Sequence, residues 1–167
     1  MPVTNIALSV SEHQYWLTGL GGLDGVNDIE PSKYMGTNGL ISALGFLAII
    51  LTGTDAGRVS VTADWRQDAP PVDLDSWDEV VEVSMLFDED QAALFGHDDR
   101  DERFPLLDAG SYRVRVHARG RDQGAAVMYP GDNPVEEHLV VAWPQPQAAE
   151  KIHKVSDAYG AQIRALP

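Results

Sequence analysis

Acidic side chains dominate the middle of the chain. Residues 68–108 contain 14 Asp and Glu residues but only two basic ones, Arg100 and Arg103. This segment therefore accounts for 12 of the 14 net negative charges of the 167-residue protein. Like charges at this density repel each other and lower stability. We therefore expect an acidic surface that attracts a basic partner; the alternative is a set of solvated loops that pair with arginines of the same chain.

Two groups of these acids, together with one tryptophan, form the predicted partner-binding site. Trp77 lies among the acids, and tryptophan is enriched where proteins bind each other tightly. The alternative for Trp77 is structural, in which the ring anchors a loop against the edge of the fold. The predicted site comprises Asp73, Asp75, Trp77, Asp78 and Glu79, followed by Asp98, Asp99, Asp101 and Glu102.

The spacing of these acids does not match a metal site. A calcium loop of the EF-hand type needs Gly at its sixth position and Glu at its twelfth. Counting from Asp73, these positions hold Asp78 and Ser84. The chain has no cysteine, no G-x-S-x-G elbow and no H-E-x-x-H pair. We therefore predict no metal, no cofactor and no catalytic residue, and a binding protein explains the sequence better than an enzyme.

One predicted strand is locally basic. Arg113, Arg115 and Arg119 alternate with apolar residues and lie, with His117, on one face of it. A protein with a pI near 4.5 lacks the basic surface that DNA and anionic membranes require. We therefore expect cross-strand ion pairs, with Glu82 as a candidate partner, and no direct contact with nucleic acid or membrane.

The apolar run of residues 40–51 is too short to cross a membrane. A transmembrane helix needs roughly 20 apolar residues, whereas this run is interrupted by Ser42 and Gly45. The N-terminus has no basic residues ahead of an apolar stretch, so it does not have the form of a secretory signal. These features predict a cytoplasmic protein.

Alternating apolar and polar residues predict strands over most of the chain up to residue 145. Residues 40–51 are compatible with a strand or a buried helix, and the turn-forming residues on both sides favour strands. We expect residues 46–51 and 58–65 to form an antiparallel hairpin.

A helical period appears only near the C-terminal end. Apolar residues there recur at steps of three and four, which predicts an amphipathic helix over residues 147–166. The expected fold is mainly β, an antiparallel β-sandwich over residues 5–145 with this C-terminal α-helix. No linker or repeat divides the chain, so we expect residues 1–167 to form a single domain.

Four segments of the chain resemble the ComJ family. They are residues 8–15 (LSVSEHQY), 39–42 (GLIS), 108–114 (DAGSYRV) and 137–141 (EHLVV). Members of that family are small bacterial proteins that inhibit a DNA-entry nuclease, in the manner of immunity proteins. The resemblance implies such an inhibitor, and it carries over no set of inhibitory residues. The acidic segment and the C-terminal helix look like additions to the family pattern.

Taken together, the sequence predicts a non-enzymatic acidic protein that inhibits a basic partner, such as a bacterial nuclease or nuclease toxin, by occlusion. The alternative is a small-ligand- or carbohydrate-binding β-sandwich, or an enzyme, with its site in a cavity of the sheet. Residues 19–31 and 120–134 would then shape the mouth of that cavity. A third possibility is a subunit that docks into an assembly through the C-terminal helix. The partner, the oligomeric state and the strand order stay open.

Overall fold

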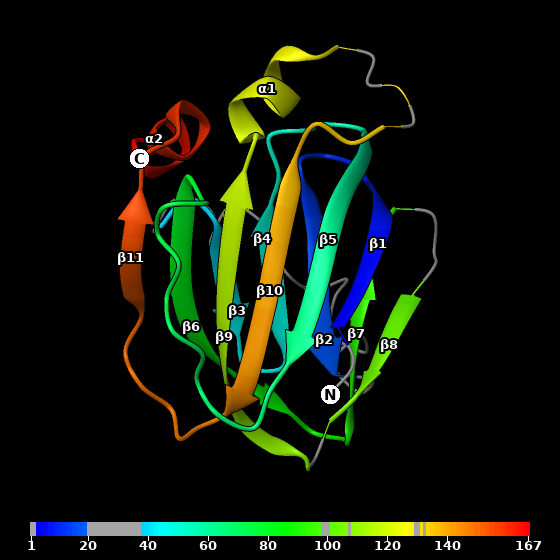
Figure 1. Ribbon diagram of the computed structural model, residues 1–167, viewed down its shortest axis with the longest axis vertical. Helices are drawn as coiled ribbons and strands as arrows, with labels where there is room; N and C mark the ends of the chain where they lie inside the picture. The colour runs from blue at the N-terminus through cyan, green and yellow to red at the C-terminus, as the bar shows by residue number, and fades with distance from the viewer. Residues whose placement is uncertain (1–2, 20–37, 98–100, 107, 129–130, 132) are drawn as a thin grey trace.

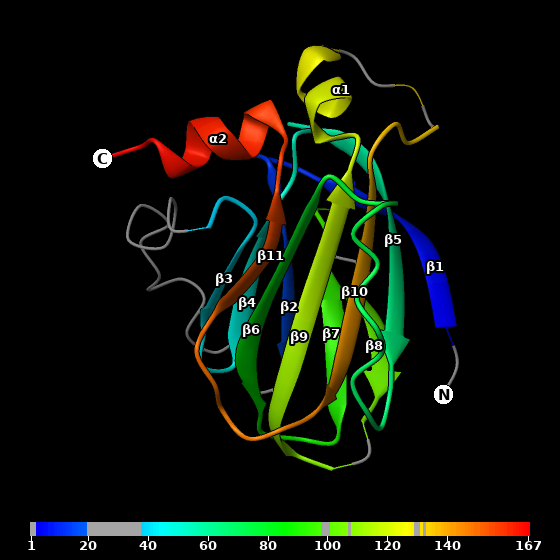
Figure 2. The same cartoon turned by 60° about the vertical axis from the view of Figure 1, so that its left-hand side comes forward.

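The computed structural model describes residues 3–19, 38–97, 101–106, 108–128, 131 and 133–167, with residues 101–103 described by their backbone alone. Over these residues the chain forms two β-sheets that pack face to face, with two short helices at one end (Figures 1 and 2). The predicted fold class, a mainly β sandwich with a C-terminal α-helix, is confirmed.

Six strands form one sheet and five form the other. The first sheet has the order β1 (Val3–Val10), β5 (Gly57–Trp65), β10 (Glu137–Pro144), β9 (Gly110–Arg119), β6 (Glu79–Phe87) and β11 (Lys151–Val155). The second has the order β3 (Ile41–Leu44), β4 (Leu47–Leu51), β2 (Gln14–Gly19), β7 (Gln91–Phe95) and β8 (Asp101–Pro105). Paired strands run antiparallel except β5 and β10, which are parallel.

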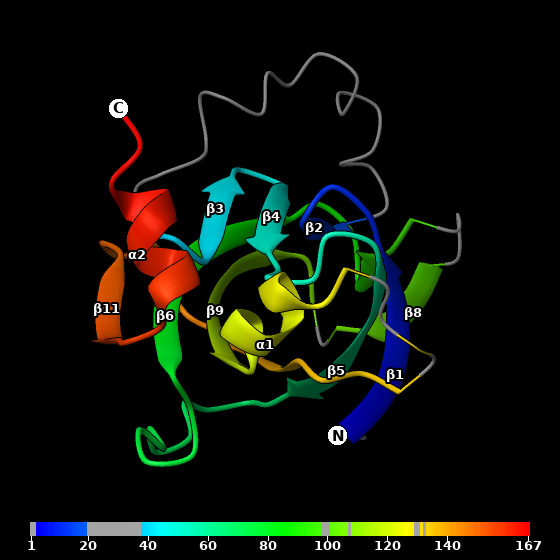
Figure 3. The same ribbon diagram turned by 90° about the horizontal axis from the view of Figure 1, so that it is seen from above.

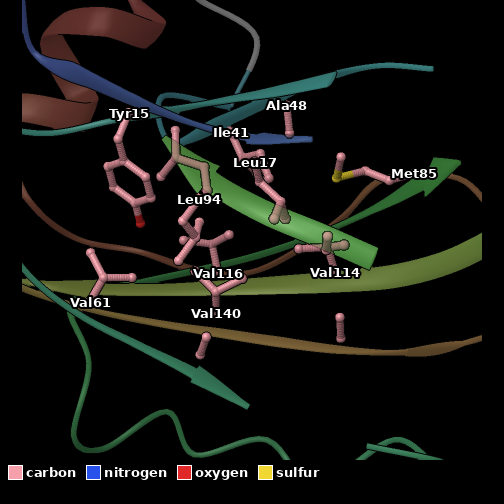
Figure 4. Packing of buried hydrophobic residues seen from close by; sticks show 14 of the residues in the cluster. Tyr15, Leu17, Ile41, Ala48, Val61, Met85, Leu94, Val114, Val116 and Val140 are labelled. Carbon is pink, nitrogen blue, oxygen red and sulfur yellow. The ribbon is translucent and has the colours of Figure 1, made fainter. Parts of the chain in front are cut away.

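The core lies between the sheets because each strand turns alternate side chains inward. On β9, Val114, Val116 and Ala118 are fully buried, as the alternation of this strand predicts. Leu17 of β2 and Leu94 of β7 belong to the same cluster and face them from the other sheet (Figure 4). Apolar side chains therefore occupy the space between the sheets.

The apolar run of residues 40–51 forms two strands rather than a helix. β3 and β4 are joined at Gly45, whose φ of 65° is a left-handed conformation that glycine adopts easily. The predicted hairpin of residues 46–51 with 58–65 is wrong, because β4 pairs with β2 and β3 while β5 pairs with β1 and β10. Residues 52–56 cross from one sheet to the other instead of turning back within one.

The C-terminal helix is shorter than the sequence predicts. α2 (Ala158–Arg164) begins after Asp157, whose carboxylate accepts a hydrogen bond from the Gly160 amide at 2.6 Å. Residues 151–155, predicted as helix, form β11 and pair with β6. The unpaired edge of β6 offers ladder hydrogen bonds to this segment, and Ile152 stays 46% exposed rather than packing as a helical face.

The two helices lie together at one end of the sandwich (Figure 3). Asp122 of α1 (Arg121–Ala126) accepts hydrogen bonds from the backbone amides of Ala158 at 3.1 Å and Tyr159 at 2.9 Å, so that it caps the first turn of α2. In the part of the chain that the structure describes, no helix has the length and apolar character needed to cross a membrane.

A truncation of one core side chain tests this packing. Leu94→Ala removes a fully buried side chain, and we expect it to lower the free energy of unfolding by about 2–5 kcal/mol. Leu166→Ala, at a position that is 51% exposed, is the matched control and should change it by less than about 0.5 kcal/mol. Urea denaturation followed by circular dichroism measures both; equal effects would contradict the described core.

Candidate binding surface

Residues 66–78 connect β5 to β6 and cross the outer face of the six-stranded sheet (Figures 1 and 3). We call this segment the acidic strap. Basic side chains hold it by its backbone: Arg115 donates to the Pro70 carbonyl at 3.0 Å, and Lys154 donates to the Leu74 carbonyl at 2.7 Å. Because these cations bind carbonyls, the middle of the strap attaches to the sheet without using the carboxylates of Asp73 and Asp75.

Trp77 fixes the end of the acidic strap to β9. Its ring lies 5.5 Å from the His117 ring, and the Arg119 guanidinium lies 4.7 Å from its centroid. Arg119 also donates to the Ser76 carbonyl at 3.2 Å. Burial in this contact lowers the pKa of His117 to about 4. Trp77 therefore anchors the loop, as the structural alternative predicts, while it remains half-buried and in part accessible.

Three predicted site residues lie together on the acidic strap. Asp73 and Asp75 are exposed, and Asp78 is half-buried with its carboxylate accepting from the Gly120 amide at 3.2 Å. Hydrogen bonds from Ser76 hold the pKa of Asp73 below its ordinary value. Among the described residues, none of the three carboxylates has a basic side chain within ion-pair distance.

Glu79 does not belong to this exposed group, although the sequence places it there. It is 0% exposed, and its carboxylate accepts from the backbone amides of Ser156 and Asp157, both at 3.1 Å. Arg164 of α2 donates to it at 3.1 Å. The C-terminal segment covers this end of β6, so Glu79 is not available to a partner. Burial raises the pKa of Glu79 to about 7.

The second predicted group of acids lies elsewhere. Asp98 and Asp99 fall outside the described residues. The backbone of Asp101 and Glu102 belongs to β8, the edge strand of the five-stranded sheet, while their side chains are not described. Figures 1 and 3 place β8 and the acidic strap on different sides of the molecule. The structure therefore does not bring these two groups together.

The basic stripe of β9 is neutralised within the protein. Glu82 of β6 accepts from Arg113 Nε at 3.0 Å and from Arg115 Nε at 2.9 Å, which confirms the predicted cross-strand pairing. His153 approaches the same carboxylate at 3.1 Å. Burial alone would raise the pKa of Glu82, but these hydrogen bonds hold it below its ordinary value. The arginines are only 2% and 4% exposed, because the acidic strap and the C-terminal segment cover them; Arg113 donates to the Ala148 carbonyl at 3.0 Å.

A second buried ionic cluster joins the two helices to the sandwich, and sequence reasoning missed it. Arg121 of α1 is 0% exposed and donates to the two oxygens of Asp157 at 2.7 and 2.9 Å. A third hydrogen bond runs from Arg121 to the Gly39 carbonyl at 2.7 Å, and Tyr159 lies against the guanidinium. The signal available in the sequence was Asp157, an N-cap residue three positions before Gly160.

A third buried chain of polar groups ties the sheets to each other. Glu136 accepts from the backbone amide of Thr54 at 2.8 Å, which holds the crossing between β4 and β5. His138 Nε2 lies 2.8 Å from Glu136, and His138 Nδ1 lies 2.9 Å from the Tyr15 hydroxyl. This Glu–His–Tyr chain has the composition of a proton relay, but none of its members is more than 1% exposed. It therefore bridges β10 and β2 inside the core.

These contacts pair most of the described arginines internally and leave a group of acids exposed; Arg58 donates instead to the Ala7 carbonyl at 3.1 Å. Six arginines each form an ion pair with a carboxylate of the chain: Arg66, Arg113, Arg115, Arg119, Arg121 and Arg164. By contrast, exposed acids from residues 68–108 have no such partner in the described part of the chain: Asp68, Asp73, Asp75, Asp88, Glu89, Asp90 and Asp108. These unpaired acids therefore place negative charge on the surface of the described part of the protein.

Among the described residues, nothing favours the predicted alternative of a cavity within the sandwich. Apolar side chains of both sheets pack in the space between them (Figure 4), and the Glu136–His138–Tyr15 chain is buried there as well. Residues 120–134, expected to shape the mouth of a cavity, include α1. Of residues 19–31, only Gly19 lies in the described part of the chain.

Two solved structures are similar to this chain in fold. ComJ from Bacillus subtilis, described as the inhibitor of the DNA-degrading activity of NucA, gives a TM-score of 0.58 over 86% of this chain and 95% of its own, at 14% identity. The chain has a ComJ-like fold. Crocagin biosynthetic gene J gives a TM-score of 0.56 over 86% of this chain and 97% of its own, at 16% identity. No protein-family model matches the chain, and no curated protein matches it in sequence. The resemblance to ComJ is thus confirmed at the level of the fold.

Removal of the buried counter-charge tests the network around Glu82. Glu82→Gln leaves two buried arginines without a carboxylate, and we expect a loss of about 3–5 kcal/mol in the free energy of unfolding. Glu137→Gln breaks the ion pair with Arg119. The side chains of Arg119 and Glu137 are 43% and 49% exposed, so this variant should lower the free energy of unfolding by no more than about 1 kcal/mol. Urea denaturation at neutral pH measures both variants; a Glu82→Gln protein as stable as Glu137→Gln would contradict the assignment.

Glu79 makes stability depend on pH. Its pKa is about 7 in the folded protein against an ordinary value of 4.5, so folding retains a proton that the unfolded chain releases between these values. The stability that Glu79 contributes is present below about pH 4.5 and is lost as the pH rises to about 7. Wild type should therefore lose stability between pH 5 and pH 8, whereas Glu79→Gln should not lose this contribution. The free energy of unfolding of Glu79→Gln minus that of wild type should rise by on the order of 2–3 kcal/mol over this range. A constant difference between the two proteins would contradict this assignment.

Proposed function

We propose that this protein is a non-enzymatic inhibitor that binds a basic protein, such as a nuclease or nuclease toxin, through its acidic strap. The observation behind this proposal is the separation of charges: the buried arginines are paired internally, while Asp73 and Asp75 are exposed and unpaired among the described residues. An exposed carboxylate of this kind attracts lysine and arginine side chains and accelerates association.

The way in which the acidic strap is held favours recognition. Its backbone is fixed to the sheet by Arg115 and Lys154, and its end is fixed by Trp77. A loop that is already ordered loses little conformational entropy when it binds. Its carboxylates would pair with the cationic groups that a nuclease uses to hold the phosphates of DNA, and they would thereby occlude the site.

The structural neighbours support this proposal at the level of the fold. ComJ, which has a similar fold, is described as the inhibitor of the DNA-degrading activity of NucA. We extend that role to this chain as a proposal, with Asp73, Asp75, Trp77 and Asp78 as the contact residues. Glu79 is left out because it is buried. The group Asp98, Asp99, Asp101 and Glu102 stays a prediction.

A nuclease-inhibition assay tests the proposal. The protein is added to a panel of basic DNA-degrading nucleases that includes NucA, and plasmid degradation is followed at increasing salt. We expect stoichiometric inhibition of at least one nuclease, with an association rate that falls as salt screens the charges. The variant Asp73→Asn/Asp75→Asn should weaken inhibition about tenfold or more, while Asn at position 73 can still form the turn with Ser76.

The matched control is Glu89→Gln/Asp90→Asn, which removes the same charge from the turn between β6 and β7. It should leave inhibition nearly unchanged. Inhibition that is insensitive to salt, or that both double variants weaken equally, would show that the acidic strap is not the contact surface. Absence of inhibition across the panel would contradict the proposed class of partner.

A further inference from the structure

A pocket of about 330 Å³ lies between the β1–β2 turn and the end of β7. Its lining includes Ser11, Glu12, Gln14, Trp16, Phe95 and His97. This set combines two aromatic rings, one carboxylate and several neutral hydrogen-bonding groups, and it contains no lysine or arginine. The chemistry of the lining is therefore suited to a cation with a flat face.

The aromatic part of the pocket is built by strand pairing. Trp16 of β2 and Phe95 of β7 are direct partners in the ladder, so that both lie on the outer face of the five-stranded sheet. Their sequence neighbours Leu17 and Leu94 point inward and are fully buried. The packing of these leucines fixes the strand register, and the register places the two aromatic residues directly opposite each other on the outer face. Faces of aromatic rings attract cations, most strongly that of tryptophan.

The carboxylate of the pocket belongs to Glu12, which lies on a turn that hydrogen bonds hold in place. Glu12 and His13 have φ values of 55° and 61°, a left-handed conformation that costs non-glycine residues of order 1 kcal/mol each. His13 holds the turn in place, because its Nδ1 lies 3.1 Å from the carbonyls of both Thr52 and Gly53. The Thr52 amide also donates to the His13 carbonyl at 2.8 Å. Glu12 is thus presented at the pocket, exposed and without an ion-pair partner among the described residues.

The negative charge of the pocket comes from Glu12. The lining contains no lysine or arginine that would neutralise this carboxylate. A cation therefore gains from entering the pocket, whereas a neutral ligand does not.

We propose that this pocket receives an arginine side chain of a basic protein. The guanidinium stacks on Trp16 and Phe95 and donates to the Glu12 carboxylate, while Gln14 and Ser11 accept its remaining hydrogens. Arginine fits better than lysine, because its planar group can stack and donate at the same time. The identity of the occupant rests on the proposed function. The pocket itself lies on the five-stranded sheet and forms a contact separate from the acidic strap.

A titration with small probes tests the pocket without any partner protein. N-acetyl-arginine amide is added to the ¹⁵N-labelled protein, and N-acetyl-citrulline amide, which has a similar shape but no charge, is added in parallel. We expect saturable shifts of the Trp16 indole and the His97 amide with the arginine probe at millimolar concentration, and much smaller shifts with citrulline. Glu12→Gln should weaken arginine binding about fivefold or more, whereas Glu89→Gln, the matched control, should leave it unchanged.

The outcomes separate this proposal from the proposed function. Equal binding of citrulline and arginine, equal effects of Glu12→Gln and Glu89→Gln, or no saturable shift overturns the arginine pocket, while the nuclease assay with the strap variants stands independently. Glu12 is exposed on a turn, and an unchanged amide spectrum of the free variant shows that the fold persists.

Discussion

Glu82 accepts hydrogen bonds from two arginines that lie buried on the outer face of the sheet beneath the acidic strap and the C-terminal segment, and much of the structure follows from that constraint. A covered guanidinium without a counter-charge costs several kcal/mol, so β6 has to supply a carboxylate opposite Arg113 and Arg115. The remaining donors also need acceptors, and the acidic strap and the C-terminal segment supply backbone carbonyls. Both segments are consequently held across the outer face of the six-stranded sheet by their main chains.

This arrangement leaves the carboxylates of Asp73 and Asp75 on the acidic strap exposed to the solvent. Had the arginines paired with Asp73 or Asp75, the acidic segment would be a set of internal ion pairs with little to offer a partner. Instead, Glu82 serves both arginines, Asp157 serves Arg121 and Glu79 serves Arg164. Internal pairing by buried acids thus leaves exposed acids of the described residues without a counter-charge, which is the physical basis for the proposed basic partner.

The sequence predicts those features that depend on neighbours within one strand or on one strand pair. The alternation of β9 indicates its buried face, and opposite charges on neighbouring strands indicate the pairing of Glu82 with the basic stripe. Features that depend on distant segments could not be predicted. Glu79 looks like its acidic neighbours in sequence, but α2 and the segment before it cover it. The crossing between β4 and β5 depends on Glu136, which lies more than 80 residues away from Thr54 in the sequence. The positive φ values of Glu12 and His13 occur without a glycine, the residue that would have predicted them.

The most direct test of this account is hydrogen–deuterium exchange of the protein with and without a basic nuclease of the proposed partner class. The charge separation predicts slower amide exchange in the acidic strap, residues 66–78, on binding. It also predicts little change along β3 and β4, which carry none of the proposed contact residues. Protection confined to other surfaces, with no change in the acidic strap, would contradict the claim that internal pairing of the arginines leaves this segment to bind the partner.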